Sequence, residues 1–426
     1  MPSFRSRLVI LAACVCLVCG CGPDRKFNLS AKERLFAVAP PSAKDLAKMK
    51  LQYYWTGSVE LAVGESLRRM WRLDEKLYLL TSNNRLVALD AATGAFAWSC
   101  QVADGKKDVF APCHADGAAI PTVSGMKALR ESPLPEETKS IDAVIVNTLA
   151  YALVIDRKTG TVKRKLEFEF VANSAGCCDG THFYVGSVKG WFYAVRLSEG
   201  LVTWAMTTED MITTAPKYAG GVLYVASNDG NFYAVRPDLG RERRRFWRQV
   251  TDGPLTAGFA VAQIEPGQGA CFVPSEDYRL YAYNSVTGKT LWILRAQGPL
   301  LKPVQVGVKS VFQYAHRDRF YALDLATGRK RWQMPQGRLV LGAAGAYVFV
   351  LSDKREMLAV HEVLGDVEHS VFMSGLDLFV PNAAESVLYA ASRSGGVACI
   401  RPIGAGHLTA AKLKAREDQD KTGAGP

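Results

Sequence analysis

The 426-residue chain contains 48% hydrophobic and 22% charged residues, a composition typical of folded globular proteins and not of disordered chains. After the first 20 residues no stretch is long and apolar enough to cross a bilayer, which excludes further membrane-spanning helices. The formal net charge of +11 favours anionic lipid headgroups, acidic proteins or nucleic acid as partners.

The first 20 residues have the pattern of an export signal. Arg5 and Arg7 precede an apolar run from Leu8 to Val18, and small residues follow. The run is too short to span a bilayer comfortably, so a retained transmembrane anchor is the weaker alternative. Removal of the two arginines lowers the net charge from +11 to +9. Because the chain is exported, we expect no nucleic-acid partner.

Residues 18–21, Val-Cys-Gly-Cys, resemble the bacterial lipobox, in which the last cysteine is lipidated and becomes the mature N-terminus. The resemblance implies that Cys21 carries a lipid that anchors the chain to a membrane. In such lipoproteins an aspartate after the cysteine favours the inner membrane. Here that position is Gly22, which implies the outer membrane, with the chain facing the periplasm. Cleavage by the ordinary secretory route is the alternative.

Residues 51–408 repeat one unit. Its centre is an Asp-x-x-Thr-Gly turn, as in Asp90 to Gly94, where the carboxylate accepts backbone N–H groups and the glycine supplies a left-handed residue. The closing glycines stand at positions 94, 160, 200, 240, 288, 328, 365 and 404, with intervals of 37 to 66 residues that are mostly close to 40. A period near forty is typical of the blades of a β-propeller.

Each unit predicts two adjacent antiparallel strands before the turn and one strand after it. Leu223 to Ser227 and Phe232 to Val235, joined by Asn-Asp-Gly, illustrate the hairpin. The strand after the turn carries a tryptophan, which we interpret as a structural side chain docking between neighbouring blades. These tryptophans are Trp98, Trp204, Trp247, Trp292 and Trp332.

The last unit lacks the strand that should follow Gly404. Residues 52–56 resemble that strand but have no turn motif before them. We therefore predict that they form the outermost strand of the last blade, with Trp55 in the docking position, because this pairing removes an exposed sheet edge. The predicted fold is all-β, an eight-bladed propeller of four-stranded antiparallel blades, closed by an N-terminal strand.

Three segments fall outside the repeats. Residues 21–50 are expected to form a tether that contains a short helix over 42–48. Residues 103–142, which are rich in proline, are expected to form a loop excursion from the second blade. Residues 409–426 are expected to form a charged tail without regular structure.

The alanine before the turn, the Asp-x-x-Thr-Gly turn and the tryptophan four residues later resemble the repeat of the pyrroloquinoline-quinone (PQQ) propellers, a superfamily of quinoprotein dehydrogenases and non-enzymatic relatives. Among these, a lipoprotein made of little but one propeller resembles the scaffold lipoprotein of the outer-membrane β-barrel assembly machine. The resemblance implies a monomeric, non-enzymatic scaffold that binds envelope proteins, including a β-barrel assembly complex.

The resemblance also leaves an enzymatic function as an alternative. In quinoprotein alcohol dehydrogenases a vicinal disulfide packs on the cofactor, and Cys177 and Cys178, followed by Asp179, resemble that run. Position favours a structural interpretation, because the pair falls on an ordinary strand and turn. We therefore expect no catalytic residue, no PQQ or other cofactor and no metal site, and keep a PQQ-dependent oxidoreductase and a ligand-sensing propeller as alternatives.

Six cysteines remain in the folded body. In an oxidising periplasm any close pair is a candidate disulfide, including Cys177 with Cys178, and the sequence leaves the connectivity open. The six are Cys100, Cys113, Cys177, Cys178, Cys271 and Cys399.

The densest basic segment follows Gly240. It is a candidate docking patch for an acidic partner or for lipid phosphates, and its alternative is a solvated outer turn. Its arginines are Arg241, Arg243, Arg244, Arg245 and Arg248.

Overall fold

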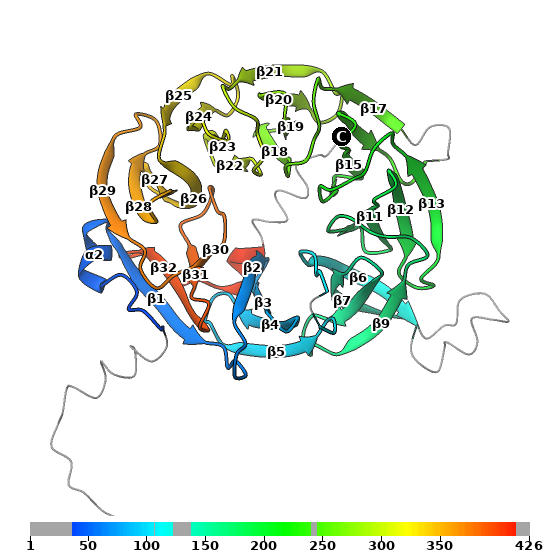
Figure 1. Cartoon of the computed structure of the whole chain (residues 1–426), viewed down its shortest axis with the longest axis horizontal. Helices are drawn as coiled ribbons and strands as arrows, with labels where there is room; N and C mark the ends of the chain where they lie inside the picture. The colour runs from blue at the N-terminus through cyan, green and yellow to red at the C-terminus, as the bar shows by residue number, and fades with distance from the viewer. Residues whose placement is uncertain (1–35, 106, 122–137, 240–244, 415–426) are drawn as a thin grey trace, which may run out of the picture.

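A computed structural model describes residues 36–105, 107–121, 138–239 and 245–414. Eight four-stranded antiparallel sheets stand around a central axis, each with one strand innermost and one outermost (Figure 1). The predicted eight-bladed, all-β propeller is confirmed.

The blades follow one another in chain order. Blade I comprises β2 (Leu67–Leu73), β3 (Lys76–Thr81), β4 (Arg85–Asp90) and β5 (Phe96–Gln101), and blade II comprises β6 (Cys113–Pro121), β7 (Thr138–Asn147), β8 (Tyr151–Asp156) and β9 (Val162–Glu167). Blade III comprises β10 (Cys177–Cys178), β11 (His182–Gly186), β12 (Trp191–Arg196) and β13 (Val202–Thr207), and blade IV comprises β14 (Lys217–Ala219), β15 (Val222–Ala226), β16 (Asn231–Val235) and β17 (Arg245–Val250). Blade V comprises β18 (Ala260–Glu265), β19 (Gln268–Pro274), β20 (Arg279–Asn284) and β21 (Thr290–Arg295), and blade VI comprises β22 (Gln305–Val306), β23 (Ser310–Tyr314), β24 (Phe320–Asp324) and β25 (Lys330–Met334). Blade VII comprises β26 (Gly337–Ala344), β27 (Tyr347–Ser352), β28 (Glu356–His361) and β29 (Val367–Phe372), and blade VIII comprises β30 (Leu378–Phe379), β31 (Leu388–Ala391), β32 (Gly396–Pro402) and β1 (Leu51–Ser58).

The repeated turn forms as its chemistry requires. Asp90 Oδ1 accepts the backbone N–H groups of Ala92 and Thr93 at 3.1 and 2.8 Å. Gly94 closes the turn with φ of +75°, a left-handed conformation that glycine adopts without a steric penalty. In five blades the alanine before the turn lies directly opposite the tryptophan of the outer strand, as Ala88 lies opposite Trp98.

Five indoles reach the turn of the next blade. A Cβ on Gly328 would lie 2.4 Å from the ring of Trp292, so the glycine is required by packing as well as by φ. The indole Nε1 atoms donate to turn carbonyls: Trp55 to Ala91 (3.2 Å), Trp98 to Arg157 (2.8 Å), Trp247 to Ser285 (3.1 Å), Trp292 to Leu325 (3.3 Å) and Trp332 to Glu362 (2.8 Å). Trp204 packs on Tyr184 and Phe192 of its own blade.

Blade II replaces the indole with an arginine. The guanidinium of Arg164 donates to the carbonyls of Ser198 and, at 2.7 Å, of Glu199 in the turn of blade III. At this position the seam between blades II and III therefore has a polar contact, where five other seams have an indole.

The ring closes at blade VIII as predicted. β1 pairs antiparallel with β32, with Trp55 opposite Cys399. The indole of Trp55 also packs against Gly94 of blade I. The N-terminal strand therefore joins the last blade to the first and leaves no open sheet edge at the seam.

The strand order gives the ring two different faces. One face, here called the motif face, carries the turns between first and second strands and between third and fourth strands. The other, here called the link face, carries the turns between second and third strands and the links between blades. This follows because successive strands of a blade are antiparallel.

The predicted tether is wrong from residue 36 onward. The predicted helix is present as α2 (Ala43–Lys48), capped by Ser42, whose hydroxyl accepts the Asp45 N–H. Phe36, Leu46 and Met49 are at most 5% exposed and pack into the core between blades VII and VIII. Three widely spaced apolar side chains suffice to dock this segment, so residues 36–50 belong to the folded body.

The structure also differs from the boundaries predicted for the loop excursion and for the C-terminal tail. Residues 113–121 and 138–142 of the predicted loop excursion belong to β6 and β7, so the innermost hairpin of blade II is itself extended. Residues 410–414 of the predicted tail form a helical turn beside β2 (Figure 1). Leu413, 3% exposed, is buried in the core between blades VIII and I, which explains why this end of the chain is ordered.

Candidate docking surface

Apolar side chains gather on the link face over blades II to IV. They belong to the turns between β7 and β8 and between β11 and β12, to the links after β9 and β13, and to the start of β12. We call them the link-face patch, which comprises Leu149, Phe168, Phe170, Val171, Val188, Trp191, Tyr193 and Met211. Five of the eight, namely Leu149, Val171, Val188, Trp191 and Met211, are between 37% and 49% exposed. Exposed apolar groups that cluster in this way mark interaction sites more often than scattered ones do.

Hydrogen bonds join the segments that carry the patch. The Ala172 N–H donates to the carbonyl of Leu149 at 2.8 Å, the Val188 N–H donates to the carbonyl of Val171 at 3.2 Å, and the Asn173 amide donates to Met211 Sδ at 3.7 Å. The patch is therefore continuous across the seam between blades II and III and reaches blade IV.

An aromatic stack supports the patch from below. The rings of Phe170 and Tyr193 are 3.7 Å apart and nearly parallel, and Phe168 stacks on Phe170 at 4.8 Å. The stack begins at the fully buried Phe183 and ends at Trp191, which is 40% exposed. Burial in this stack raises the pKa of Tyr193. Stacked rings have few rotamers to lose, so a partner that packs on them forfeits little side-chain entropy.

Charged side chains surround the apolar centre. Glu169, Glu209 and Asp210 are exposed along the links, and Lys189 is exposed in the turn before Trp191. An apolar centre within a polar rim is the usual anatomy of a protein interface. The excess of carboxylates here is local, because the chain as a whole is basic.

Sequence reasoning missed this patch, although one signal was present. Trp191 begins the third strand of blade III. The equivalent position in five other blades is polar or charged, namely Arg85, Asn231, Arg279, Arg319 and Glu356. An indole in place of these polar groups adds exposed apolar area that the fold does not need.

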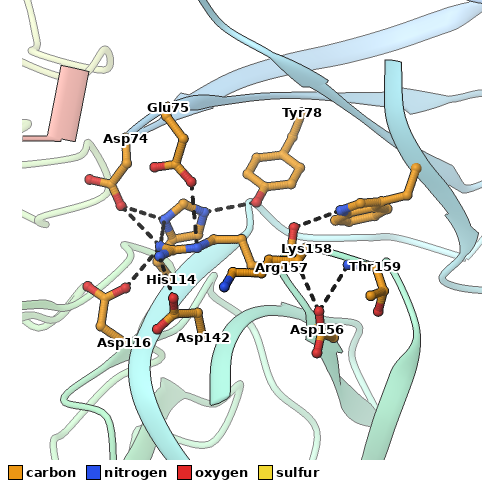
Figure 2. Close-up of polar contacts among 11 residues, drawn as sticks. Asp74, Glu75, Tyr78, His114, Asp116, Asp142, Asp156, Arg157, Lys158 and Thr159 are labelled. Atoms are coloured by element: carbon orange, nitrogen blue, oxygen red, sulfur yellow. Dashed lines mark hydrogen bonds and ion pairs between the residues drawn. The ribbon is translucent and has the colours of Figure 1, made fainter. Parts of the chain in front are cut away.

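A second cluster, also missed, lies on the motif face between blades I and II (Figure 2). The guanidinium of Arg157 lies within 2.9 to 3.7 Å of carboxylate oxygens of four residues: Asp74, Glu75, Asp116 and Asp142. Asp74 is fully buried and the Arg157 side chain is 6% exposed. Because the carboxylates come from two blades, this cluster holds the blades together.

His114 completes the cluster. Its Nδ1 lies 2.6 Å from Asp74 Oδ2 and its Nε2 lies 2.9 Å from the Tyr78 hydroxyl. A neutral ring with its proton on Nδ1 satisfies both contacts, because Nδ1–H donates to the carboxylate and Nε2 accepts from the hydroxyl. Burial lowers the pKa of His114, and this outweighs the opposing effect of Asp74. Among the described residues, no group of three or more His, Cys, Asp and Glu side chains could hold a metal ion.

The central cavity is lined by the innermost strands and has a volume of about 510 Å³. Arg72 and Glu385 in its wall form a 2.9 Å ion pair between blades I and VIII. The Gln305 amide both donates to and accepts from the backbone of Val340, each at 2.8 Å. These side chains stabilise contacts between blades around the cavity.

The sequence-predicted site residues are dispersed. Cys177 and Cys178 form β10 and are not bonded to each other. Arg245 and Arg248 lie exposed on the outer strand β17, with Arg245 5.3 Å from the centre of the Tyr233 ring. Cys21, Arg241, Arg243 and Arg244 fall outside the described residues. Within the described part of the chain, no helix has both the length and the apolar character needed to cross a bilayer.

Comparison with known proteins finds similarity to one family. The family model described as outer membrane protein assembly factor BamB matches residues 238–408. Curated proteins of that name match at 25% identity over 223 residues in Yersinia pestis, 27% over 117 residues in Nitrosomonas eutropha and 24% over 159 residues in Bordetella pertussis. These matches cover 49%, 28% and 36% of this chain and 55%, 26% and 39% of the relatives. The chain thus spans about half the length, or less, of the curated relatives it matches.

Two solved structures are similar to this chain in fold. BamB from Moraxella catarrhalis superposes with a TM-score of 0.59 at 14% identity, over 84% of this chain and 99% of that one. The computationally designed Ika8 protein superposes with a TM-score of 0.56 at 11% identity, over 81% of this chain and 98% of the designed one. At these identities the structures support the fold alone. Together with the sequence matches, the repeated turn and indole show a β-propeller of PQQ-like repeats that resembles the outer membrane protein assembly factor BamB.

Proposed function

We propose that the protein is a non-enzymatic, membrane-anchored scaffold that binds partner proteins of the cell envelope and acts in outer-membrane protein assembly. The observation that carries the proposal is the link-face patch, an apolar surface on a rigid stack with a charged rim. Relatives named for outer membrane protein assembly support the choice of process.

The proposed anchor is a lipid on Cys21, inserted in the periplasmic leaflet of the outer membrane. Residue 36, where the described body begins, lies on the link face, because the Ala37 N–H donates to Ser394 in the turn between β31 and β32. The start of the described body and the patch therefore lie on the same face of the ring, over different blades. This arrangement supports a complex in which a membrane-associated partner meets the patch.

We propose further that the scaffold works without PQQ or another cofactor. A vicinal disulfide that packs on a quinone must present both sulfurs to it. Here the side chains of Cys177 and Cys178 enter different cores between blades, with Cys177 beside Tyr218 and Cys178 beside Cys113. That placement supports a structural role for the pair.

The test is crosslinking in intact envelopes followed by affinity purification of the tagged protein. Trp191→Ser combined with Val171→Ser should reduce recovery of β-barrel assembly components at least tenfold, because it removes apolar area from the patch centre. Phe96→Ser is the matched control, since Phe96 is 65% exposed on the outer strand of blade I. Equal recovery from all three proteins would refute the proposed surface. Recovery of no assembly component by the wild-type protein would refute the proposed process.

A further inference from the structure

Three thiols lie on two adjacent innermost strands. Cys113 begins β6 of blade II, and Cys177 and Cys178 form β10 of blade III. β6 and β10 are in contact. All three residues are partly exposed, and all three are reduced cysteines in the structure.

The two cysteines of β10 point to opposite sides, as neighbouring residues of a strand must. Cys178 packs with Cys113, Ala115 and Phe183 in the core between blades II and III. Cys177 instead packs with Tyr184 and Tyr218 in the core between blades III and IV. Only Cys178 therefore shares a core with the thiol of blade II.

The strands approach closely just beyond the cysteines. A Cβ on Gly180 would lie 2.9 Å from the carbonyl oxygen of Asp116, so the glycine permits a backbone contact between blades. The Gly180 N–H donates to Cys178 Sγ at 3.3 Å. Burial raises the pKa of the Cys178 thiol, the nearby Cys113 adds to this effect, and the Gly180 N–H opposes it. Cys113 likewise raises the pKa of Cys177, so the shared core, and not the electrostatics, distinguishes Cys178.

We propose that Cys113 and Cys178 form a disulfide that joins blades II and III. The oxidant is a small-molecule or protein disulfide. The Cys178 thiolate attacks one oxidant sulfur and releases the other as a thiol, which leaves a mixed disulfide on Cys178. The Cys113 thiolate then attacks Cys178 Sγ and releases the second thiol. Two cysteine thiols lose two protons and two electrons, and one oxidant disulfide becomes two thiols.

The bond would reinforce a seam that lacks a docking indole. Blade II contacts the turn of blade III through Arg164 and Leu166, and it also carries the extended β6–β7 hairpin. A covalent link at Cys113, the first residue of β6, fixes that hairpin against blade III. Blade III also supports the link-face patch. The inference rests on the proposed export, since disulfides persist in oxidising compartments.

Peptide mapping of purified full-length protein tests the bond. The protein is equilibrated with oxidised glutathione, remaining thiols are blocked with a maleimide, and a tryptic digest is analysed without reduction. Because Cys177 and Cys178 share one tryptic peptide, three variants are compared with wild type: Cys113→Ser, Cys177→Ser and Cys178→Ser. Circular dichroism confirms that each variant is folded.

We expect the crosslinked peptide pair in wild type and in Cys177→Ser, and its loss in Cys113→Ser and Cys178→Ser. An internal Cys177–Cys178 bond in wild type, a crosslink that survives Cys178→Ser, or full maleimide labelling of Cys113 after oxidation would each overturn the proposal. If Cys178→Ser fails to fold, the Cys177→Ser digest decides the point, because Cys178 is then the only cysteine of its tryptic peptide. Because the assay uses purified protein, its outcome is independent of export and of partner binding.

Discussion

Trp98 and Arg157 meet across the seam between blades I and II: the indole Nε1 donates to the arginine carbonyl at 2.8 Å. The same arginine directs its guanidinium back to Asp74 and Glu75 at the first turn of blade I (Figure 2). One residue thus receives the repeated aromatic contact of the propeller and adds a buried ionic contact that belongs to this seam.

Arg157→Gln should therefore lower the free energy of unfolding by about 3 kcal/mol, because it leaves the carboxylate of Asp74 buried with less compensation. Chemical denaturation measures the change. Arg196→Gln is the matched control, since Arg196 pairs with Glu199 in the turn of blade III and its side chain is 44% exposed. The control should cost less than about 1 kcal/mol. Equal losses in the two variants would contradict the role assigned to the cluster.

His114 should make stability depend on pH. Its pKa is held below the usual 6.5 by burial, so the unfolded chain binds the proton more readily than the folded one. The stabilisation is complete above the unfolded pKa and is lost as the pH falls from 6.5 toward the lower pKa of the folded state. Urea unfolding at about pH 7.5 and about pH 5 should show a smaller loss for His114→Gln than for wild type. Identical losses would show that other groups control this range.

Two tryptophans should respond oppositely to the same substitution. Trp55→Ala removes the indole that packs on Gly94 and donates to Ala91, and should cost about 3 kcal/mol of stability because it opens the closing seam. Trp191→Ala removes a ring that is 40% exposed and should cost less than about 1 kcal/mol while weakening partner binding. Thermal melts and pull-downs on both proteins measure the two effects. A Trp55→Ala protein that melts like wild type would leave the closure of the ring unexplained.

Residues 36–50 should contribute to the stability of the folded body, and a substitution at Leu46 tests this. Leu46 is fully buried, and Leu46→Ala should cost about 3 kcal/mol. Lys48→Ala on the same helix is the control, because the Lys48 side chain is 64% exposed and its ion pair with Asp45 is screened by solvent. Denaturant titration compares the two. If both variants unfold at the wild-type midpoint, the segment is a tether after all.

Cys21→Ala should release the protein from membranes. A lipidated cysteine with at least two acyl chains gives stable anchoring, whereas a single chain binds only marginally. Fractionation of cells into soluble and membrane portions measures the effect. A variant that still sediments with membranes would contradict the lipobox interpretation.

The sequence predicted the features that repeat. The spacing of the glycines set the number of blades, and the strand missing after Gly404 indicated the pairing of residues 52–56 with the last blade. Neither the link-face patch nor the Arg157 cluster repeats. Leu149 and Trp191, or Asp74 and Arg157, lie tens of residues apart in the chain, and only the curvature of the ring brings each pair together. Phe36 and Leu46 were missed for another reason: they are too few to give a periodic signal.

The closing strand has a mechanical consequence. In an anchored chain any pull from the membrane enters the ring through residue 36 and travels toward β1, the strand whose detachment would open the propeller. Phe36, Leu46 and Met49 stand between the point of pulling and that strand, packed in the core between blades VII and VIII. A load on the lipid must therefore extract these three side chains before it reaches the hydrogen bonds between β1 and β32. The segment before the ring therefore shields the closing strand from a load applied at the anchor.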